Sequence, residues 1–287
     1  MKFRMTSCIG EILRLHGKHF EAVLNLDTSS ARIEVQCLLQ TVLQVNRAWL
    51  LTHPEQSLNP EQYTRYTALF ERRLRGEPIA YILGEREFYG LNFKVTPATL
   101  IPRPDTELLI ELMLQRIPQR ETLRILDLGT GSGAVALSIA HARPDTEVTA
   151  VDASQEALDV ARENAQCLNI DNVRLLHSDW FSALTGERFD LIVSNPPYIS
   201  ASDAHLIQGD LRFEPRAALA SGADGLDDIR RIIAQARAHL NAEGHLLLEH
   251  GYDQAARVRA LLQQAGFTGV FSARDLAEIE RVSGGLA

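Results

Sequence analysis

The chain has 287 residues, of which 45% are hydrophobic and 23% charged, a composition typical of globular proteins long enough for two domains. It contains no run of about 20 apolar residues that would span a membrane. Lys2 and Arg4 give residues 1–5 a basic charge, but no apolar segment follows, which argues against a secretory signal. Met5 is an alternative start. The chain has three cysteines, Cys8, Cys37 and Cys167, which lie far apart in the sequence. Their odd number and their spacing give neither a disulfide framework nor a metal site, and they predict reduced thiols in a cytoplasmic protein.

Charge is unevenly divided along the chain. Residues 1–100 carry 12 Lys and Arg against 10 Asp and Glu, whereas residues 101–287 carry 17 Arg and no Lys against 27 Asp and Glu, a net charge near −10. A domain that docks alone on nucleic acid usually has a basic face, because counterion release supplies much of the affinity. The acidic second part therefore disfavours stable nucleic-acid binding and suits a protein substrate, above all a basic one.

Residues 1–85 show the patterns of a small helical domain. Asn59-Pro60-Glu61-Gln62 predicts a helix start, with Asn59 as cap, Pro60 in the first turn and Gln62 at the third position. Apolar stripes predict two earlier helices; their residues are Ile9, Ile12, Leu13 and Leu15 in the first, and Ile33, Val35, Leu38, Leu39, Val42 and Leu43 in the second. We expect a helical bundle over residues 1–85 that captures the substrate; a packing appendage without a recognition role is the alternative.

Residues 86–104 change character. Residues 87–95 mix aromatic and β-branched side chains around Gly90 and Asn92, which predicts a β-hairpin. Three prolines then predict a stiff, extended passage to the next domain; they are Pro97, Pro102 and Pro104. We expect a β-hairpin linker here, with Arg103 either assisting the site or forming a surface salt bridge.

From residue 105 onward, strand and helix patterns alternate. Helices are expected at residues 108–114, after 133, and at 155–168, 226–240 and 254–265; strands are expected at 123–128, 147–151, 173–177, 189–194 and 244–249, and near 268–271 and 281–283. Strands separated by helices imply parallel pairing with crossovers and a ligand at the carboxyl ends of the strands. We therefore predict an α/β, Rossmann-like domain over residues 105–287, with a mostly parallel seven-stranded sheet.

A glycine-rich turn follows the first strand of this domain. Gly129-Thr130-Gly131-Ser132-Gly133 places glycines at alternate positions, where the backbone can adopt positive φ and a ligand can approach the main chain closely. The spacing matches neither the dinucleotide fingerprint nor a phosphate loop. Asp152 ends the next strand about 20 residues later, where a carboxylate can bind a ribose diol. The alternative role for Asp152 is to cap the following helix, although the neighbouring Ser154 can do so instead.

The tetrad Asn195-Pro196-Pro197-Tyr198 is the most informative motif, and it directly follows a buried strand. Asn195 can accept and donate hydrogen bonds, and the proline after it holds it in extended geometry. Pro196 and Pro197 leave carbonyls as the only main-chain polar groups, while Tyr198 offers a flat face for a planar group. The tetrad therefore predicts a stiff cradle for a planar group that carries an NH2, such as a carboxamide or the exocyclic amine of a base.

Together these motifs resemble the S-adenosylmethionine-dependent methyltransferases of the Rossmann-like class. The resemblance is most specific to the PrmC/HemK family, the protein-(glutamine-N5) methyltransferases that modify peptide-chain release factors. Supporting stretches extend along nearly the whole chain: Gly76-Glu77-Pro78-Ile79-Ala80-Tyr81-Ile82-Leu83-Gly84, Leu100-Ile101-Pro102-Arg103-Pro104-Asp105-Thr106-Glu107, Ser178-Asp179-Trp180, Ser194-Asn195-Pro196-Pro197-Tyr198-Ile199, Arg212-Phe213-Glu214-Pro215-Arg216 and Leu248-Glu249-His250-Gly251.

The resemblance implies transfer of a methyl group from S-adenosylmethionine to the N5 amide of the glutamine in the Gly-Gly-Gln motif of class-1 release factors. Cofactor contacts are implied for Gly129, Thr130, Gly131, Ser132, Gly133, Asp152, Asp179, Trp180 and Asn195, with the Trp180 ring stacked on adenine. A Trp180 buried in the core is the alternative. Substrate contacts are implied for Asn195, Pro196, Pro197 and Tyr198, of which Asn195, Pro196 and Tyr198 act in catalysis. We expect a monomer that acts on release factors.

Other functions share the same cradle. A ribosomal-protein glutamine methyltransferase is close, although the stretch from Ile101 to Glu107 looks like the release-factor version. An N6-adenine methyltransferase of nucleic acid would also use an NH2 cradle, but the acidic charge and the helical N-terminal region disfavour it. A cofactor-binding or RNA-binding module without catalysis is a different class of answer, disfavoured by the combination of an intact turn, Asp152 and the tetrad. Asp190 and His177 are expected to be structural, and a catalytic role for His250 is disfavoured.

Overall fold

The computed structural model describes residues 8–117 and 122–287, so the alternative start at Met5 lies outside the described residues. The chain divides into two compact units with the boundary between Gly84 and Glu85. Unit 1 ends at Gly84, and unit 2 comprises residues Glu85–Ala287. None of the helices in the described ranges is long and apolar enough to cross a membrane.

Unit 1 is helical, as predicted. Its helices are α1 (Ile9–Leu24), α2 (Thr28–Leu43), α3 (Arg47–Thr52), α4 (Pro60–Leu74) and α5 (Ile79–Leu83). The predicted stripes lie on α1 and α2, and α4 begins with the predicted capping box, in which the side chain of Asn59 accepts from the backbone of Gln62 and the Gln62 side chain accepts from that of Asn59. The short helices α3 and α5 were not predicted, because five or six residues carry too little periodicity.

A hydrophobic core of its own holds unit 1 together. Side chains from α1, α2 and α4 fill it, among them Ile12, Phe20, Leu38, Leu39, Tyr66 and Phe70, each at most 2% exposed. An ion pair of Arg73 with Glu34, at 2.7 Å, joins α4 to α2 beside this core. Most apolar side chains of these helices are thereby removed from water, but Leu15 and Ile33 of the predicted stripes are exposed.

The predicted hairpin forms from β1 (Glu85–Phe88) and β2 (Leu91–Lys94), which pair antiparallel. Tyr89 and Gly90 both adopt positive φ, the geometry of a two-residue turn whose twist matches that of the strands. Phe88 and Phe93 are buried in a core of unit 2. The hairpin is thus packed into unit 2.

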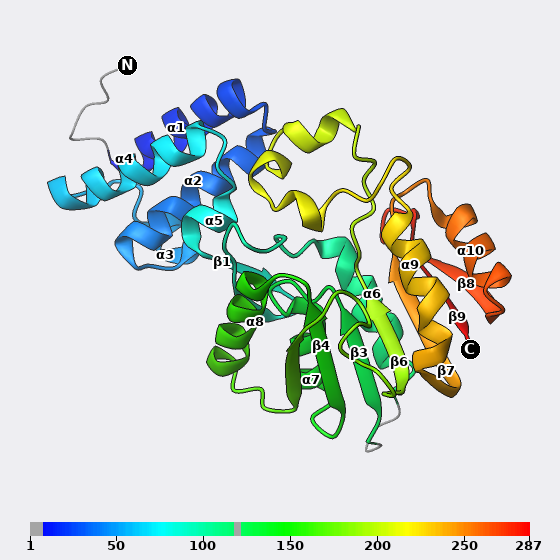
Figure 1. Ribbon diagram of the computed structural model, residues 1–287. Helices are drawn as coiled ribbons and strands as arrows, with labels where there is room; N and C mark the ends of the chain where they lie inside the picture. The colour runs from blue at the N-terminus through cyan, green and yellow to red at the C-terminus, as the bar shows by residue number, and fades with distance from the viewer. Residues whose placement is uncertain (1–7, 118–121) are drawn as a thin grey trace. The chain divides into compact units, whose positions relative to one another are not determined.

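A seven-stranded sheet forms the centre of unit 2 (Figure 1), with the order β5-β4-β3-β6-β7-β9-β8. The strands are β3 (Arg124–Leu128), β4 (Glu147–Asp152), β5 (Val173–His177), β6 (Phe189–Ser194), β7 (Leu240–Glu249), β8 (Thr268–Arg274) and β9 (Glu280–Leu286). Pairing is parallel from β5 to β7 and antiparallel at β7–β9 and β9–β8. The mostly parallel sheet with an antiparallel edge confirms the predicted Rossmann-like fold.

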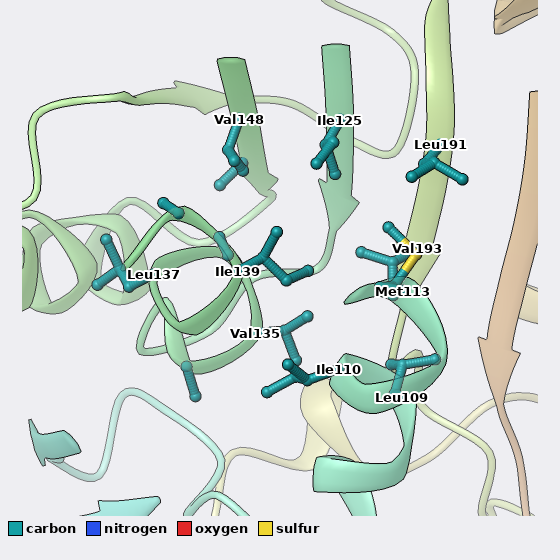
Figure 2. Close-up of a cluster of buried hydrophobic side chains, with 14 of the residues drawn as sticks. Leu109, Ile110, Met113, Ile125, Val135, Leu137, Ile139, Val148, Leu191 and Val193 are labelled. Carbon is teal, nitrogen blue, oxygen red and sulfur yellow. The ribbon is translucent and has the colours of Figure 1, made fainter. Parts of the chain in front are cut away.

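Helices cover both faces of this sheet. The α-helices are α6 (Glu107–Leu114), α7 (Ala134–Ala142), α8 (Gln155–Cys167), α9 (Asp227–Ala236) and α10 (Ala255–Gln264), and 3₁₀ turns occupy Pro104–Thr106, Ala204–Ile207, Leu211–Phe213, Arg216–Ala218 and Arg237–His239. Figure 2 shows side chains of α6 and α7 meeting Ile125, Val148, Leu191 and Val193 from the strands. Leu126, Leu128 and Ile192, which alternate with these along their strands, pack with α9 and α10 on the opposite face.

One predicted helix is too long. The pattern at residues 226–240 predicts a continuous helix, but α9 ends at Ala236, a 3₁₀ turn follows, and β7 already begins at Leu240. Leu240 pairs with Phe189, while the next matched pair is Leu191 with His245, so β7 carries an irregularity with Glu243 at φ 62°. Pairing across the sheet therefore overrides the helical pattern of this segment.

Separate cores predict separate responses to a core substitution. Leu38→Ala removes a side chain that is 0% exposed in unit 1, and we expect it to lower the free energy of unfolding of that unit by about 2–5 kcal/mol. Hydrogen exchange should accelerate at the amides of α1, α2 and α4 and stay unchanged in β3 and β6. Leu276→Ala, at a fully exposed position, is the matched control. Equal loss of protection in both units would contradict separate cores.

Candidate active site

A pocket of about 500 Å³ lies at the carboxyl ends of β3, β4 and β6 in unit 2. The predicted site residues that line it are Gly129, Gly131, Asp152, Asp179, Trp180, Asn195 and Pro197. These residues come from four different loops, and parallel pairing brings the loops to one edge of the sheet. The structure thereby joins the motifs that the sequence treats one by one.

The glycine-rich turn is fastened to the next strand. Gly129, Gly131 and Gly133 all have positive φ, between 57° and 83°. The backbone N–H groups of Gly129 and Thr130 both donate to the carbonyl of Val151, at 2.9 Å each. Thr130, Ser132 and Gly133 do not line the pocket; the first two are buried behind it, and Gly133 precedes α7. The pocket wall is therefore formed by Gly129 and Gly131, with the other three residues shaping the turn.

Asp152, at the end of β4, joins two loops. Its Oδ2 accepts from the backbone N–H of Gly131 at 2.8 Å, and its Oδ1 accepts from that of Ser154 at 2.9 Å. Burial raises the pKa of this carboxyl, and these hydrogen bonds oppose the shift. Each carboxylate oxygen keeps a further acceptor position for a ligand hydroxyl. Ser154 caps α8 by accepting from the backbone N–H of Ala157, so the capping role that the sequence also allowed for Asp152 falls to Ser154.

Trp180 forms one wall of the pocket. Its ring lies against the glycine-rich turn, since a Cβ atom placed on Gly129 would come within 3.4 Å of it. Its indole Nε1 donates to Asp228 at 3.2 Å, and its backbone has φ 50°, which is rare for a bulky residue. The ring is half-buried, so it is not a side chain enclosed in the core. The preceding Asp179 is exposed and forms an ion pair with Arg231 at 2.8 Å.

The tetrad follows β6, and only some of its side chains line the pocket. Asn195 points its Nδ2 at the hydroxyl of Thr106, 3.1 Å away, and lines the pocket. The described residues supply no hydrogen-bond donor to Asn195 Oδ1. Pro196 is buried, and Pro197 lines the pocket. The carbonyl of Tyr198 accepts from Gln254 at 2.9 Å, which fixes the backbone at the end of the tetrad.

Two fully buried carboxyl groups lie close to the site. Asp127, in β3 directly ahead of the glycine-rich turn, accepts from the hydroxyl of Thr130 at 2.6 Å. Glu249, at the end of β7, accepts from the hydroxyl of Tyr198 at 3.2 Å. Burial raises the pKa of each carboxyl to about 7. Burial also raises the pKa of Tyr198, so this phenol stays protonated.

Arg103 belongs to the frame of the pocket. It forms an ion pair with Glu214, whose side chain is buried, and Glu214 Oε2 also accepts from the backbone N–H of Ile101 at 3.1 Å. This connects the proline-rich segment to the loop whose Pro215, Ala217 and Ala218 line the pocket. Of the two roles expected for Arg103, the structure supports the salt bridge. Its partner Glu214 is buried, so the pair is not a pure surface contact.

Asp190, His177 and His250, for which the sequence favoured structural roles, all contact other parts of the fold. Asp190 accepts from the backbone N–H of Arg124 and from the side chain of Asn241, at 2.8 and 2.7 Å. His177 Nε2 lies 2.9 Å from the carbonyl of Ala153. His250 is buried and its Nε2 lies 2.8 Å from the hydroxyl of Ser283. Among the described residues, no three His, Cys, Asp or Glu side chains are grouped closely enough to hold a metal ion.

Sequence reasoning missed the residues that support the tetrad, above all Thr106 and Glu249. Thr106 contacts Asn195 from 89 positions earlier in the chain, so no local pattern connects the two residues. Glu249 had a detectable signal, because it is a charged residue at the end of an otherwise apolar run, Leu246-Leu247-Leu248, in the strand next to that of the tetrad. Asp228 and Arg231, which hold Trp180 and Asp179, gave no comparable signal.

Comparison with known proteins identifies matches to both units of the chain. The family model of the Methyltransferase small domain matches residues 106–224, and that of the PrmC N-terminal domain matches residues 18–84. A methyltransferase structure from Pyrococcus furiosus has a TM-score of 0.53 and 20% identity to this chain, covering 75% of this chain and 96% of that one, and so shares the fold.

Two curated relatives are much closer in sequence. The release factor glutamine methyltransferase of Salmonella typhimurium is 50% identical over 92% of this chain and 96% of its own length. That of Bordetella pertussis is 53% identical over 90% of this chain and 96% of its own length. Because identity at this level extends across both units and nearly the full length of each relative, the chain belongs to the family of release factor glutamine methyltransferases, which confirms the resemblance of its motifs.

Proposed function

We propose that this chain transfers the methyl group of S-adenosylmethionine to the side-chain amide nitrogen of the glutamine in the Gly-Gly-Gln motif of class-1 peptide-chain release factors. The observation that carries the proposal is the orientation of Asn195, whose Nδ2 is held by Thr106 while Oδ1 is left to accept from a donor in the pocket. A primary amide supplies such a donor. The names of the relatives, release factor glutamine methyltransferases, point to the same acceptor.

The residues of the pocket fit S-adenosylmethionine. Gly129 and Gly131 leave room for close approach to the backbone, and Asp152 keeps acceptor positions for the two ribose hydroxyls. The half-buried ring of Trp180 offers a flat apolar wall for adenine. Asp179 and Asn195 complete the set of direct contacts that we propose, with Thr130, Ser132 and Gly133 holding the turn. When bound, the cofactor supplies an electrophilic methyl group and leaves as S-adenosylhomocysteine.

The protein then has to orient a poor nucleophile, because the lone pair of a carboxamide nitrogen is delocalised. Asn195 Oδ1 and the carbonyl of Pro196 would accept the two N–H bonds of the substrate amide, aim the nitrogen into the pocket and stabilise positive charge that develops on it. Pro197 and Tyr198 would pack against the amide plane. The nitrogen would form its bond to the methyl carbon as the carbon–sulfur bond of the cofactor breaks. The positively charged product is a strong acid that would lose its proton to water afterwards, so a strong general base is not needed before transfer.

We propose that unit 1 recognises the substrate, with the hairpin and proline-rich residues 86–104 leading to the catalytic residues 105–287. The support is the match of the PrmC N-terminal domain to residues 18–84 and the independent core of this unit. A groove of about 320 Å³ in unit 1 is lined by Arg14, Lys18 and Arg32 together with Glu21. Its excess of positive charge suits a negatively charged segment of a protein.

We further propose that the chain acts as a monomer in the cytoplasm, where translation terminates. The proposal excludes stable nucleic-acid binding, because residues 101–287 have a net charge near −10 and would be repelled by phosphates.

The acceptor can be tested directly. The purified protein is incubated with methyl-labelled S-adenosylmethionine and, in separate reactions, with unmodified release factor, ribosomal proteins and adenine-containing DNA or RNA. We expect label on the release factor alone, and its loss when the Gly-Gly-Gln glutamine is replaced. Label on ribosomal protein or nucleic acid would keep the NH2 cradle and contradict the proposed acceptor, whereas cofactor binding without transfer to any of them would contradict an enzyme of this kind.

Asn195 should act mainly in the chemical step. We expect Asn195→Ala to lower kcat by about 10²–10³-fold, because it removes one preorganised acceptor from the transition state. Binding of S-adenosylmethionine, measured by calorimetry, should weaken much less. Asn92→Ala, at an exposed position of the hairpin, is the matched control. Near wild-type turnover of the Asn195 variant would show that the cradle is assigned wrongly.

The recognition role of unit 1 predicts a change in KM. Reversal of two charges in the groove, Arg14→Glu with Arg32→Glu, should raise the KM for the release factor on the order of 10-fold, since charge complementarity speeds association. The kcat, the cofactor affinity and the KM for a short Gly-Gly-Gln peptide should stay unchanged. Arg47→Glu with Arg65→Glu, at two exposed positions outside the groove, makes the same change in net charge and is the control. An equal effect on protein and peptide substrates would remove the case for recognition by this unit.

A further inference from the structure

Asp228 lines the pocket, but the proposed function gives it no role. It lies beside Asp227 in the first turn of α9, where acidic side chains stabilise a helix because the positive end of the helix dipole is there. The side chain of Asp227 is 60% exposed and pairs with Arg230 at 2.9 Å, whereas that of Asp228 is 20% exposed. Helix stabilisation could explain either carboxyl group, but it does not explain the position of Asp228 at the pocket.

The neighbour of Asp228 in the pocket wall, Trp180, has a backbone conformation that bulky residues rarely adopt, with φ 50°. The hydroxyl of the buried Ser178 donates to the carbonyl of Trp180 at 2.7 Å and so holds this backbone. Such a conformation costs free energy and persists only where the surroundings impose it, often at functional sites. The position of the Trp180 ring is therefore a candidate for selection by function.

The Trp180 ring is held at both of its edges. The six-membered part lies against the glycine-rich turn, since a Cβ atom on Gly129 would come within 3.4 Å of Cζ3. At the other edge, Nε1 donates to Asp228 Oδ1 at 3.2 Å. Two contacts at opposite edges leave little freedom for the ring to rotate out of the wall, and Asp228 supplies the one that is a hydrogen bond.

The carboxylate of Asp228 is itself anchored. Its Oδ2 accepts from the hydroxyl of Ser221 at 2.7 Å, and the backbone N–H of Asp228 donates to Ser221 Oγ at 2.8 Å. Ser221 is 2% exposed, so these bonds are shielded from water. Oδ1 also lies 3.6 Å from Arg231. The carboxylate thus presents Oδ1 to the indole while its other oxygen is fixed in the fold.

Ser221 connects this carboxylate to the segment that follows the tetrad. The backbone N–H of Ser221 donates to the carbonyl of Ile199 at 2.8 Å, and the N–H of Ile199 donates to Leu219 at 2.9 Å. Ile199 directly follows Tyr198. The wall formed by Trp180 is therefore joined to the end of the tetrad through a short series of hydrogen bonds.

We propose that Asp228 is a positioning residue for cofactor binding, which holds the indole of Trp180 in the wall of the pocket before S-adenosylmethionine arrives. The proposal rests on the contact of Trp180 with adenine proposed above. A side chain that is already ordered loses little rotamer freedom when a ligand binds, which raises affinity. Without the carboxylate the indole N–H loses this acceptor and the ring can leave the wall, while the cradle at Asn195 stays in place.

The first test is Asp228→Ala. We expect the Kd for S-adenosylmethionine, measured by calorimetry, to rise about 3–10-fold, because a mobile side chain must now be ordered on binding. The kcat for the release factor at saturating cofactor should stay within about twofold of the wild type, since the loss is one of ground-state binding. Asp227→Ala, at the adjacent carboxyl group of the same turn, is the matched control and should leave both values unchanged. A wild-type Kd in Asp228→Ala would overturn the proposal.

Asp228→Asn separates the hydrogen bond from the charge. Its side-chain oxygen can still accept from the indole and its NH2 can donate to Ser221 Oγ, so most of the affinity should return. An affinity as low as that of Asp228→Ala would assign the effect to the lost charge and contradict the role in positioning.

A double-mutant cycle with Trp180→Phe separates positioning from direct contact between Asp228 and the ligand. Phenylalanine keeps a flat ring but has no N–H to donate. If Asp228 acts through the indole, Asp228→Ala should change the Kd little further in the Trp180→Phe background. The same fold-change in both backgrounds would show that Asp228 acts on the ligand itself, and the proposal would fail.

The indole group also reports its own position without a ligand. Trp49 and Trp180 are the two tryptophans of the chain, so Trp49→Phe leaves the side-chain N–H of Trp180 as a single indole signal in nitrogen-15 spectra. In this background Asp228→Ala should shift the signal and accelerate its exchange with water, and Asp227→Ala should do neither. An unchanged signal in Asp228→Ala would show that the carboxylate does not hold the ring.

These outcomes differ from those that test the proposed function. If the wild type binds S-adenosylmethionine but labels no release factor, the proposed acceptor fails, and the Kd values still decide the role of Asp228. If the wild type binds no S-adenosylmethionine, both the proposed cofactor site and this inference are overturned.

Discussion

Parallel pairing of β4, β3 and β6 is the constraint on which the site depends. Because the three strands point the same way, the glycine-rich turn, Asp152 and the tetrad leave the sheet at one edge. The backbone then joins them: Gly129 and Thr130 donate to Val151 at the end of the neighbouring strand, and Gly131 donates to Asp152. The pocket is therefore a consequence of sheet topology, and each loop is held by its neighbour.

A second layer behind the pocket fixes the side chains that line it. Thr106 holds Asn195, Asp228 holds Trp180 and Arg231 holds Asp179. Side chains anchored in this way need not be ordered when a ligand arrives, which favours binding and transition-state stabilisation. The ion pair of Arg103 with the buried Glu214 has a similar effect on the loop at Pro215. Its removal by loss of one partner would leave an uncompensated charge.

Buried acids near this site link the fold to pH. Asp127 and Glu249 both lose hydration on folding, and burial raises the pKa of each to about 7. The folded chain consequently binds protons that the unfolded chain has already released between about pH 4 and pH 7. These two groups therefore make the free energy of unfolding decrease as pH rises through that range, and they make no further change above it.

The sequence alone determined the fold class, the helical character of unit 1, the start of α4 and the motifs at the strand ends, because these depend on local patterns: the spacing of apolar residues, a capping box, glycines and the Asn-Pro-Pro-Tyr run. The tertiary structure decided what depends on contacts between distant residues. It ended α9 at Ala236, because β7 pairs with β6 from Leu240 onward. It packed the hairpin into unit 2 through Phe88 and Phe93. It also placed Thr106 and Glu249 behind Asn195 and Tyr198, across 89 and 51 positions of the chain. No local pattern encodes such neighbours, since they meet only once the sheet has formed.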